Sequence, residues 1–381
     1  MSCKKFSIVT TTIRVPFFLK DFLRDIAREK NVEAEFVIIA DTATPRGAKA
    51  YARSLSGERA RVDYWDVERQ KKWLRRFPAL GRLLPYCSIQ RRNLGYLLAY
   101  LGGADVIVSV DDDNFLTQRG YLSSHGLVGK TAWVGCVGSR DGWFNICSLL
   151  ETRPPRRFYH RGYPISKRWR SAGITRSERK GRVVVNAGLW LGDPDVDTFT
   201  RLEEPFQVKR FRSSRPYVGL AKGTFSPFNS QNTAYARELL PFLYLIVAGD
   251  GLKGFKSDFV NFRYDDIWMS YFAKLAIDRM GDLVTFGQPL VLQKRNPHDL
   301  LLDMDRELIP MFLTETLVEL LAGIRLGAKS YLDLYAELIE GLRAGIARNG
   351  KLDARERLFF RQMTDGMEIW HRVCAAVMKE R

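Results

Sequence analysis

Three consecutive aspartates follow a short apolar run, and they constrain the fold more than any other stretch of the chain. Val106–Val110 reads Val-Ile-Val-Ser-Val, a composition typical of a buried strand. Asp111, Asp112 and Asp113 come directly after it. Charged side chains are almost never buried without partners, so these acids must lie where the strand leaves the sheet. In an open α/β sheet, ligands bind at the carboxyl ends of strands.

The stretch Asp111-Asp112-Asp113-Asn114 has two interpretations. Neighbouring carboxylates repel one another unless a cation holds them, and hard divalent cations prefer oxygen ligands. The first interpretation is therefore a metal site that binds a phosphorylated ligand. The second is an acidic turn that caps the next helix, because acid-rich turns are common. The tetrapeptide alone does not decide between them.

The first forty residues predict a β-α-β unit. Phe6–Thr12 and Glu35–Ala40 have the composition of strands, and Pro16–Lys30 has apolar residues near helical spacing. Such a unit implies parallel strands and a right-handed crossover. A predicted helix over Ser88–Tyr100 that leads into Val106–Val110 repeats the pattern. We therefore expect an α/β fold.

Polar side chains stand at the carboxyl ends of these predicted strands. Thr11, Thr12 and Arg14 follow the first strand, and Asp41 follows the second. Asp41 suits a hydrogen bond to a nucleobase or ribose, although taken alone it is better explained as a helix cap or loop acid. Arg92 lies in the first turns of the next helix, where it either reaches a phosphate or is simply solvated.

Two later segments carry further candidates. A predicted strand from Val183 runs into Asn186-Ala187-Gly188, where small residues either let a ligand approach the backbone or form a tight turn or bulge. Asp265 and Asp266 open a predicted helix. The helix dipole favours acids in a first turn, whether or not they face a cleft.

The last third of the chain is predicted to be mostly helical. Thr233–Leu245 is apolar and predicts a helix interrupted near Pro241, and Leu283–Phe286 predicts a short strand. His298 is a candidate metal or phosphate ligand, although a lone loop histidine is more often neither. From Arg306 onward the apolar residues recur at helical spacing. Their apolar faces need burial on the preceding domain or in a homo-oligomer.

Charge and cysteine usage narrow the class of protein. Lys and Arg number 60 against 43 Asp and Glu, a net charge of +17, which favours a polyanionic partner. No nucleic-acid-binding motif accompanies the charge, so we favour phosphate-bearing small molecules or peripheral contact with a membrane surface over nucleic acid. The five cysteines are scattered, which indicates a reducing compartment. The start of the chain lacks a signal-peptide core and no apolar run is long enough to span a membrane, so we predict a cytoplasmic protein.

Placed after a β-α-β unit, the acidic stretch resembles the metal-binding motif of the GT-A glycosyltransferases. Six further stretches occur in the order found in the reversibly glycosylated polypeptides, which include plant UDP-arabinopyranose mutases. These stretches are Thr12-Ile13-Arg14, Arg92–Tyr96, Arg161–Pro164, Asn186–Asp195, Asn232–Glu238 and Arg263–Trp268. Each is weak alone, but the ordered set is specific. The resemblance runs from about residue 6 to about residue 313.

The resemblance implies a GT-A, Rossmann-like fold with a mixed, mostly parallel sheet and flanking helices. We expect a catalytic domain over residues 1–305 and an α-helical extension over residues 306–381. The family implies a UDP-sugar donor held with Mn²⁺ or Mg²⁺. Asp113 is the expected metal ligand, with Asp111 and His298 as further candidates. The expected contacts to the nucleotide sugar are Thr11, Thr12, Arg14, Asp41, Arg92, Asp111, Asp112, Asn186 and Gly188.

Family members become glycosylated on themselves, and the acceptor implied by the resemblance is the arginine of the Arg161-Gly-Tyr-Pro164 loop. A guanidinium stays protonated and is a poor nucleophile. Transfer to Arg161 would therefore need a nearby carboxylate, and Asp265 or Asp266 is the candidate. The chain departs from the family pattern at Asn114, where a cysteine is usual, and it has no clear counterpart of a histidine in the late cleft segment.

Three functions follow as hypotheses. The first is a metal-dependent UDP-sugar glycosyltransferase that glycosylates itself on Arg161. The second is a mutase of the same fold that interconverts the pyranose and furanose forms of a UDP-sugar without net release of UDP. The third, from another class, is a non-catalytic nucleotide-sugar-binding scaffold that assembles through its helical extension.

Overall fold

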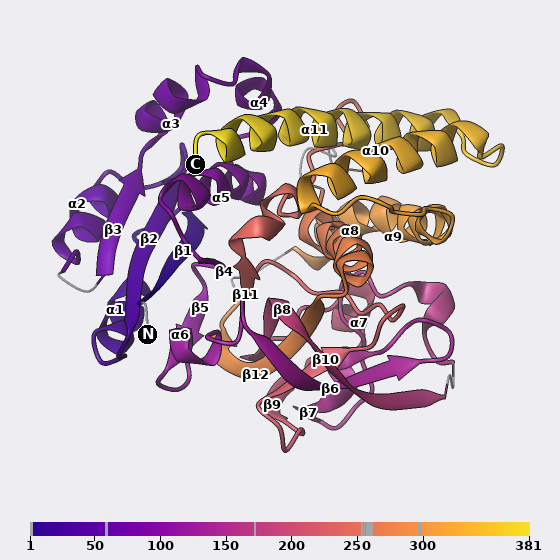
Figure 1. Ribbon diagram of the computed structural model, residues 1–381, viewed down its shortest axis with the longest axis horizontal. Helices are drawn as coiled ribbons and strands as arrows, with labels where there is room; N and C mark the ends of the chain where they lie inside the picture. Colours follow the sequence, from indigo (N-terminus) through magenta and orange to yellow (C-terminus); the bar gives the residue numbers. More distant parts are fainter. Residues whose placement is uncertain are drawn as a thin grey trace.

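The computed structural model describes residues 3–57, 60–170, 173–252, 254, 256, 262–295 and 299–381. Within these ranges the chain forms one sheet of 12 strands with helices packed around it (Figure 1). The strands are β1 (Lys4–Thr12), β2 (Val32–Ala40), β3 (Ala60–Trp65), β4 (Val106–Val110), β5 (Asn114–Leu116), β6 (Thr131–Ser139), β7 (Leu150–Arg153), β8 (Ile174–Gly192), β9 (Gln207–Phe211), β10 (Tyr217–Leu220), β11 (Asn232–Ala236) and β12 (Leu283–Gln293).

The helices lie on both faces of the sheet and at its upper edge in Figure 1. The α-helices are α1 (Leu19–Ile26), α2 (Gly47–Ser54), α3 (Val67–Leu74), α4 (Pro78–Leu83), α5 (Arg92–Leu101), α6 (Tyr121–Ser124), α7 (Thr198–Glu203), α8 (Asp265–Met280), α9 (Leu300–Ala322), α10 (Tyr331–Arg348) and α11 (Ala354–Lys379). The 3-10 helices are η1 (Ile89–Arg91), η2 (Ile146–Leu149), η3 (Ile165–Lys167) and η4 (Arg237–Phe242). The stretch from α2 to α4 holds three short helices that the weakly periodic sequence did not predict, and β3 confirms a short strand predicted over Arg61–Trp65.

The first half of the sheet is parallel, with the strand order β3-β2-β1-β4. All five residues of β4 are buried, as expected for a strand covered on both faces. This half confirms the predicted β-α-β unit and places Asp111 at the carboxyl end of β4. With the mixed strands beyond it and the flanking helices, it confirms the predicted α/β fold class.

The second half of the sheet mixes directions and contains a correction. β11 runs antiparallel to β4, with Asn232 opposite Val110. The predicted helix over Thr233–Leu245 is therefore wrong, because the segment starts as a strand and continues as the 3-10 helix η4. Every residue of β11 is buried. A strand buried on both faces loses its alternation, so periodicity cannot distinguish it from a buried helix.

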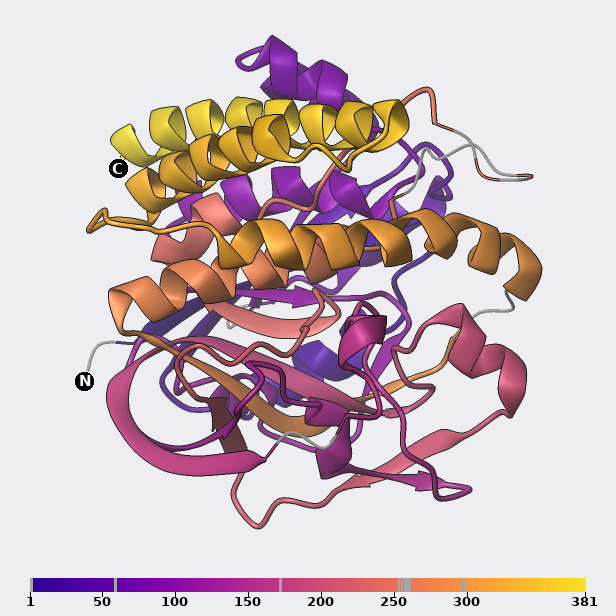
Figure 2. The same cartoon turned by 90° about the vertical axis from the view of Figure 1, so that its right-hand side faces the viewer.

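The strand predicted from Val183 begins earlier, at Ile174, and pairs with β6 along nine residues of each strand. The basic stretch before Val183 is thus one arm of a long antiparallel ribbon. β7 and β9 attach beside it, with Gly192 opposite Val208. In Figures 1 and 2 this ribbon lies at the opposite end of the molecule from α10 and α11.

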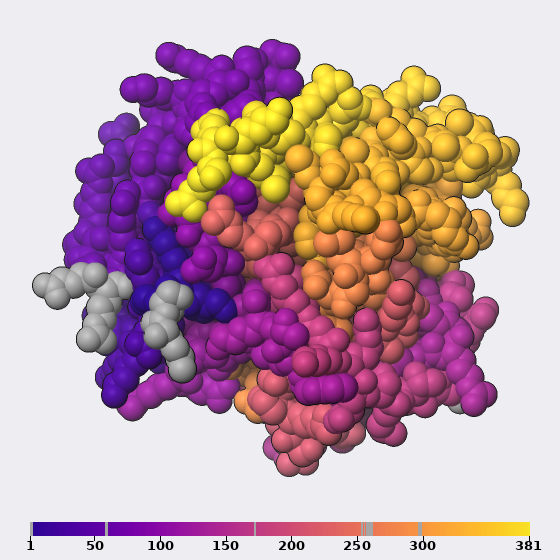
Figure 3. All heavy atoms as spheres, in the orientation of Figure 1, coloured from indigo at the N-terminus to yellow at the C-terminus, as the bar shows by residue number. Residues whose placement is uncertain are grey.

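The C-terminal helices are part of the same apolar core as the sheet domain. Leu338, Phe359 and Trp370 are buried, and the Trp370 indole N–H donates to the Pro241 carbonyl at 3.0 Å. Much of the apolar surface of the extension is therefore covered by this chain itself, although Leu301, Phe312 and Leu358 are exposed. Figure 3 shows α10 and α11 lying directly on the neighbouring surface. The helices begin at Leu300, before the expected boundary, and the division at residue 305 stays a prediction. No helix in the described ranges has the length and apolar content needed to cross a bilayer.

Candidate functional site

Two cavities meet at the carboxyl end of β4. The first has a volume of about 240 Å³ and includes Thr11, Thr12, Asp41, Arg92 and Asp112 in its wall. The second has a volume of about 340 Å³ and lies on the other side of the acidic stretch. Its charged lining residues are Asp111, Asp113, Arg161, Asp195, Arg263, Asp265, Asp266 and Arg295. Asp111 and Asp113 line both cavities, so a ligand with two parts can occupy both at once.

Asp111 is held by a buried arginine. Arg92 donates to the Asp111 carboxylate at 2.6 Å, to the Thr11 hydroxyl at 3.1 Å and to the Ser230 carbonyl at 3.0 Å. The Ser230 N–H in turn donates to Asp266 at 2.9 Å. Arg92 is thus a fixed link between the two cavities and is not a solvated helix residue.

Asp112 and Asp41 are the acids of the smaller cavity. Asp112 accepts a hydrogen bond from the Thr12 hydroxyl at 2.7 Å and pairs with Arg14 at 3.4 Å. Asp41 accepts the N–H of Cys87 on both carboxylate oxygens at 2.9 Å. Cys87 adopts φ 51°, a left-handed conformation unusual for a residue with a side chain. The predicted strand-end residues therefore do gather around one cavity.

Asp113 is the least neutralised of the three aspartates. The Asn114 amide contacts it at 3.3 Å. Burial, Asp111 and Asp112 together raise its pKa to about 7, and burial also raises the pKa of Asp111. A divalent cation between the Asp111 and Asp113 carboxylates would relieve this repulsion with the hard oxygen donors that Mn²⁺ and Mg²⁺ prefer, so the residues fit such an ion.

The protein itself supplies few ligands for such an ion. Within the described ranges, no cluster of three or more His, Cys, Asp or Glu side chains could hold a metal. His298, the further predicted ligand, lies outside the described residues. Magnesium sites often use one or two carboxylates and complete their shell with phosphate oxygens and water. The acidic stretch suits that kind of site rather than a closed protein cage.

The raised pKa of Asp113 gives a stability prediction with a definite sign. Its pKa is about 7 in the folded chain against an ordinary value of 3.8, so the folded state holds the proton more tightly. The resulting stabilisation is complete below pH 3.8 and is lost as the pH rises to about 7. Asp113→Asn mimics the protonated acid, so its Tm relative to wild type should rise from about pH 4 to about pH 8. Thermal unfolding in metal-free buffer measures this, and a pH-independent difference would contradict it.

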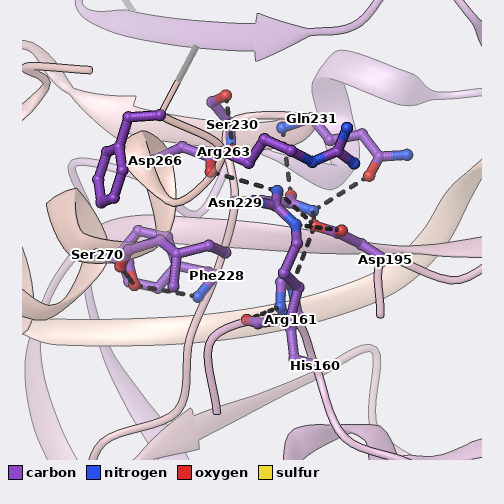
Figure 4. A network of polar contacts seen from close by, with 12 residues as sticks. His160, Arg161, Asp195, Phe228, Asn229, Ser230, Gln231, Arg263, Asp266 and Ser270 are labelled. Atoms are coloured by element: carbon purple, nitrogen blue, oxygen red, sulfur yellow. Dashed lines mark hydrogen bonds and ion pairs between the residues drawn. The ribbon is translucent and has the colours of Figure 1, made fainter. Parts of the chain in front are cut away.

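Arg161 lies in the larger cavity between two carboxylates (Figure 4). Its Nε and Nη2 donate to the two oxygens of Asp195 at 2.8 and 3.2 Å, and Nη2 also contacts Asp266 at 3.4 Å. Nη1 makes no hydrogen bond to the residues that the structure describes. Asn229 donates to Asp195 at 2.6 Å and fixes that carboxylate in turn. The guanidinium is thereby oriented with one terminal nitrogen unoccupied.

The carboxylates around Arg161 differ in their protonation. Burial opposes ionisation of Asp195, but Arg161 and His160 outweigh it and hold the pKa of Asp195 well below its ordinary value. Burial and the neighbouring Asp266 raise the pKa of Asp265 well above its ordinary value. The Asp265 Oδ2 atom is buried without a hydrogen-bond partner in the described part of the chain. Asp195 is therefore a permanent charge partner, whereas Asp265 is a poorly satisfied acid facing the cavity.

The structure brings residues into the site that sequence reasoning did not single out. Asp195, Asn229, Gln231 and Arg295 all line the larger cavity. The sequence did give an indication for Asp195, because an acidic loop follows the strand β8. Asn229 and Gln231 had no such signal, since they reach the cavity only because β11 pairs with β4.

Arg295 is an incompletely paired cation in the same wall. Its side chain is 16% exposed, its Nη2 lies 3.9 Å from Asp195, and its Nε has no hydrogen-bond partner within the described ranges. Burial lowers its pKa. A guanidinium in this state is available to an anionic ligand.

Asn186 and Gly188 line neither cavity, and their role as ligand contacts stays a prediction. The Asn186 amide contacts His125 at 3.0 Å, and its carbonyl oxygen accepts from the Thr285 hydroxyl at 2.9 Å. A Cβ at Gly188 would lie 2.3 Å from the Asn232 amide. The small residue therefore serves close packing of β8 against β11.

A protein-family model described as "Reversibly glycosylated polypeptide" matches residues 88–378. The match extends through the C-terminal helices, beyond the region in which the ordered motifs were seen. UDP-arabinopyranose mutase 3 of Arabidopsis thaliana is 30% identical over 215 residues, covering 55% of this chain and 52% of that protein. Probable UDP-arabinopyranose mutase 1 of Pisum sativum is 29% identical over 288 residues, covering 73% and 69%. The chain thus spans about half the length of the first relative.

Among solved structures, the chain is similar to glucosyl-3-phosphoglycerate synthase from Mycobacterium tuberculosis in complex with Mn²⁺ and UDP-glucose. The identity is 13%, the TM-score is 0.38, and the similarity covers 82% of this chain and 78% of that one.

Proposed function

Because the chain belongs to the reversibly glycosylated polypeptide family, we propose that it is a UDP-sugar enzyme that transfers the sugar onto its own Arg161. The observation that carries this proposal is that Arg161 lines the same cavity as Asp111 and Asp113. A nucleotide in the smaller cavity would present its diphosphate at these aspartates and its sugar toward Arg161. The names of the relatives, UDP-arabinopyranose mutases, support a UDP-linked donor.

Asp113 and Asp111 would hold Mn²⁺ or Mg²⁺, which when bound supplies positive charge to the diphosphate of the departing UDP. Arg295 supplies a second positive charge from the protein. Thr11, Thr12, Arg14, Asp41, Arg92 and Asp112 would contact the nucleotide. The carboxylates near Arg161 orient its guanidinium before the donor arrives, which removes part of the entropic barrier to reaction.

The chemical step requires Arg161 to lose a proton. Asp195 and Asp266 outweigh the effect of burial and raise the pKa of Arg161 well above its ordinary value, so the free guanidinium is not nucleophilic. We assign Asp266, 3.4 Å from Nη2, as the base that accepts the proton. A terminal nitrogen then bonds to the anomeric carbon, the bond from that carbon to the phosphate oxygen breaks, and UDP leaves with the electron pair. Asp195 stays ionised and keeps the group aligned.

The mutase is the second candidate, and the names of the relatives favour it. If UDP attacks the sugar on Arg161 in the reverse step, the sugar returns to the nucleotide, and a change of ring form in between gives a furanose. The same residues serve both reactions. What differs is whether the glycosyl group stays on Arg161 or returns to UDP.

Incubation of the purified protein with labelled UDP-sugars and Mn²⁺ tests the proposal. Label retained on the protein with release of UDP supports self-glycosylation. A furanose nucleotide without net UDP release supports the mutase. Binding of UDP without turnover would leave the non-catalytic scaffold and contradict the proposed function. The cytoplasmic location and the homo-oligomer stay predictions, which cell fractionation and light scattering would check.

Arg295→Ala is expected to weaken UDP binding by roughly 10- to 100-fold, because a hydrogen-bonded ionic contact to the diphosphate is lost. Uridine, which has no phosphate, should bind the variant about as well as wild type. Isothermal titration calorimetry with UDP and with uridine separates the loss of the diphosphate contact from any change in nucleoside binding. Lys294→Ala is the matched control, since its exposed ammonium lies over Phe115 and does not line the cavity. Equal losses for UDP and uridine would instead indicate a collapsed pocket.

A further inference from the structure

A second chemically distinctive surface begins immediately after the Arg161–Pro164 loop. Three large apolar side chains are exposed within ten residues of chain: Ile165 at 49%, Trp169 at 67% and Ile174 at 57%. Arg157, Arg170 and Arg176 are exposed beside them in the sequence. Arg157 lies against Trp169 in space, and all six residues fall within twenty residues of chain; we refer to them together as the basic–apolar surface.

Trp169 is held outward by the backbone. It adopts φ 60°, which is uncommon for a residue with a bulky side chain. Its backbone N–H donates to the Tyr159 hydroxyl at 2.8 Å, which fixes the turn. The Arg157 guanidinium lies 5.4 Å from the centre of the Trp169 ring. An exposed indole kept in a strained conformation next to a cation points to a binding role rather than to chance exposure.

The cations of this surface lack acidic partners. Arg157, Arg170 and Arg176 form no ion pair with the described residues, whereas the neighbouring Arg168 pairs with Asp197. The chain as a whole carries a net charge of +17. The basic–apolar surface is therefore electrostatically complementary to an extended anionic surface.

The fold leaves room for a large partner here. Ile174 starts β8 opposite Ser139 of β6, well before β8 reaches its pairing with β11 at Val185, while β6 pairs with β10 close to Ser139. In Figures 1 and 2 the β6–β8 ribbon lies away from α10 and α11. The ribbon end is therefore not covered by α10 or α11, while Ile165 lies next to α9, since Ser166 hydrogen-bonds to Glu315 of that helix.

We infer that the basic–apolar surface docks the protein on an anionic phospholipid bilayer. Trp and Ile enter the headgroup region, where indole rings and short apolar side chains are favoured, while the arginines contact the anionic headgroups. Nucleic acid would satisfy the arginines and stack on Trp169, but it offers nothing to two exposed isoleucines. The inference is independent of the proposed function, since it uses none of the cavity residues.

Co-sedimentation with vesicles tests the inference on the full chain. Wild type should bind phosphatidylcholine vesicles containing phosphatidylserine much more tightly than vesicles of phosphatidylcholine alone. Each cation near the surface is worth roughly fivefold in partitioning, so Arg170→Glu/Arg176→Glu should weaken binding by at least about 25-fold. Brominated lipids should quench tryptophan fluorescence of the wild type, and Trp169→Phe should remove most of that quenching.

Lys72→Glu/Arg75→Glu, on the exposed side of α3, makes the same change in net charge and serves as the control. Equal loss of binding in the control pair would show that overall charge, not this surface, attracts the bilayer, and would overturn the inference. The inference would also be overturned if wild-type protein did not bind the anionic vesicles. It would be overturned as well if the protein instead bound a single-stranded oligonucleotide through the same residues. Unchanged UDP binding by each variant verifies that it is folded.

Discussion

Replacing Arg161 with lysine is expected to abolish covalent glycosylation of the protein and to lower turnover of the UDP-sugar by roughly a thousandfold or more, as removal of a reacting group does. Lysine keeps a positive charge between Asp195 and Asp266, so the fold and the affinity for UDP should change little. The neighbouring carboxylates also keep the lysine ammonium protonated, which prevents it from acting as the acceptor. Intact-protein mass spectrometry and measurement of released UDP follow the two losses.

Arg161→Ala is expected to cause the same catalytic loss together with lower stability. It leaves Asp195, which is buried, without its closest cation, and removal of one partner of a buried ion pair costs about 3–5 kcal/mol. Comparison of the two variants therefore separates catalysis from folding. Label that persists on Arg161→Lys, at any other residue, would show that the acceptor has been assigned wrongly.

Asp113→Asn is expected to remove the Mn²⁺ dependence of UDP binding, with roughly a 100-fold loss of affinity at about pH 8. The amide retains one oxygen but no charge, so the cation loses its least neutralised ligand. The same variant should be more stable than wild type without metal, because the buried charge and its repulsion by Asp111 and Asp112, which together raise the Asp113 pKa, are gone. A variant protein that is more stable but binds UDP less tightly with Mn²⁺ is what we expect when a residue serves ligand binding at a cost in stability.

Titration of UDP with and without Mn²⁺ measures the effect of Asp113→Asn. Asp21→Asn provides a control, since Asp21 is a surface residue of α1 outside both cavities, and it should leave the affinity for UDP unchanged. Uridine binding should also survive in Asp113→Asn, because the nucleoside makes no contact with the metal. If UDP binds Asp113→Asn as it binds wild type in the presence of Mn²⁺, the acidic stretch does not hold the cation.

Local features of the sequence were enough for the first cavity. The parallel strands β1, β2 and β4 have apolar cores, and the polar residues that follow them meet at one edge because parallel strands share a direction. Thr12, Asp41 and Asp112 could therefore be placed together without knowledge of the full topology. The same reasoning did not place Asn186 and Gly188 in either cavity, because their surroundings depend on how β8 pairs with β11.

The second cavity depended on contacts between distant parts of the chain. Asp195 and Asp266 lie 34 and 105 residues from Arg161. The family resemblance suggested Asp265 or Asp266 as the carboxylate near Arg161, whereas composition and spacing gave no indication of either contact. Asp265 and Asp266 in particular had an adequate local explanation as acids in the first turn of a helix. The fold holds the start of α8 against the loop before β11, where the Ser230 N–H donates to Asp266, and this brings Asp266 to Arg161.

Composition and periodicity, which act over a few residues, were enough to predict the α/β class and the strand that ends in three aspartates. They also predicted that these carboxylates need cations as partners. Which cation meets which carboxylate depends on the folded arrangement of the sheet. Arg92 neutralises Asp111, Arg14 pairs with Asp112, and Asp113 is left without an ion-pair partner among the described residues. Each ion pair forms only where the fold brings the two side chains within hydrogen-bond distance. The attraction between two charges depends on their distance in space and not on their separation along the chain.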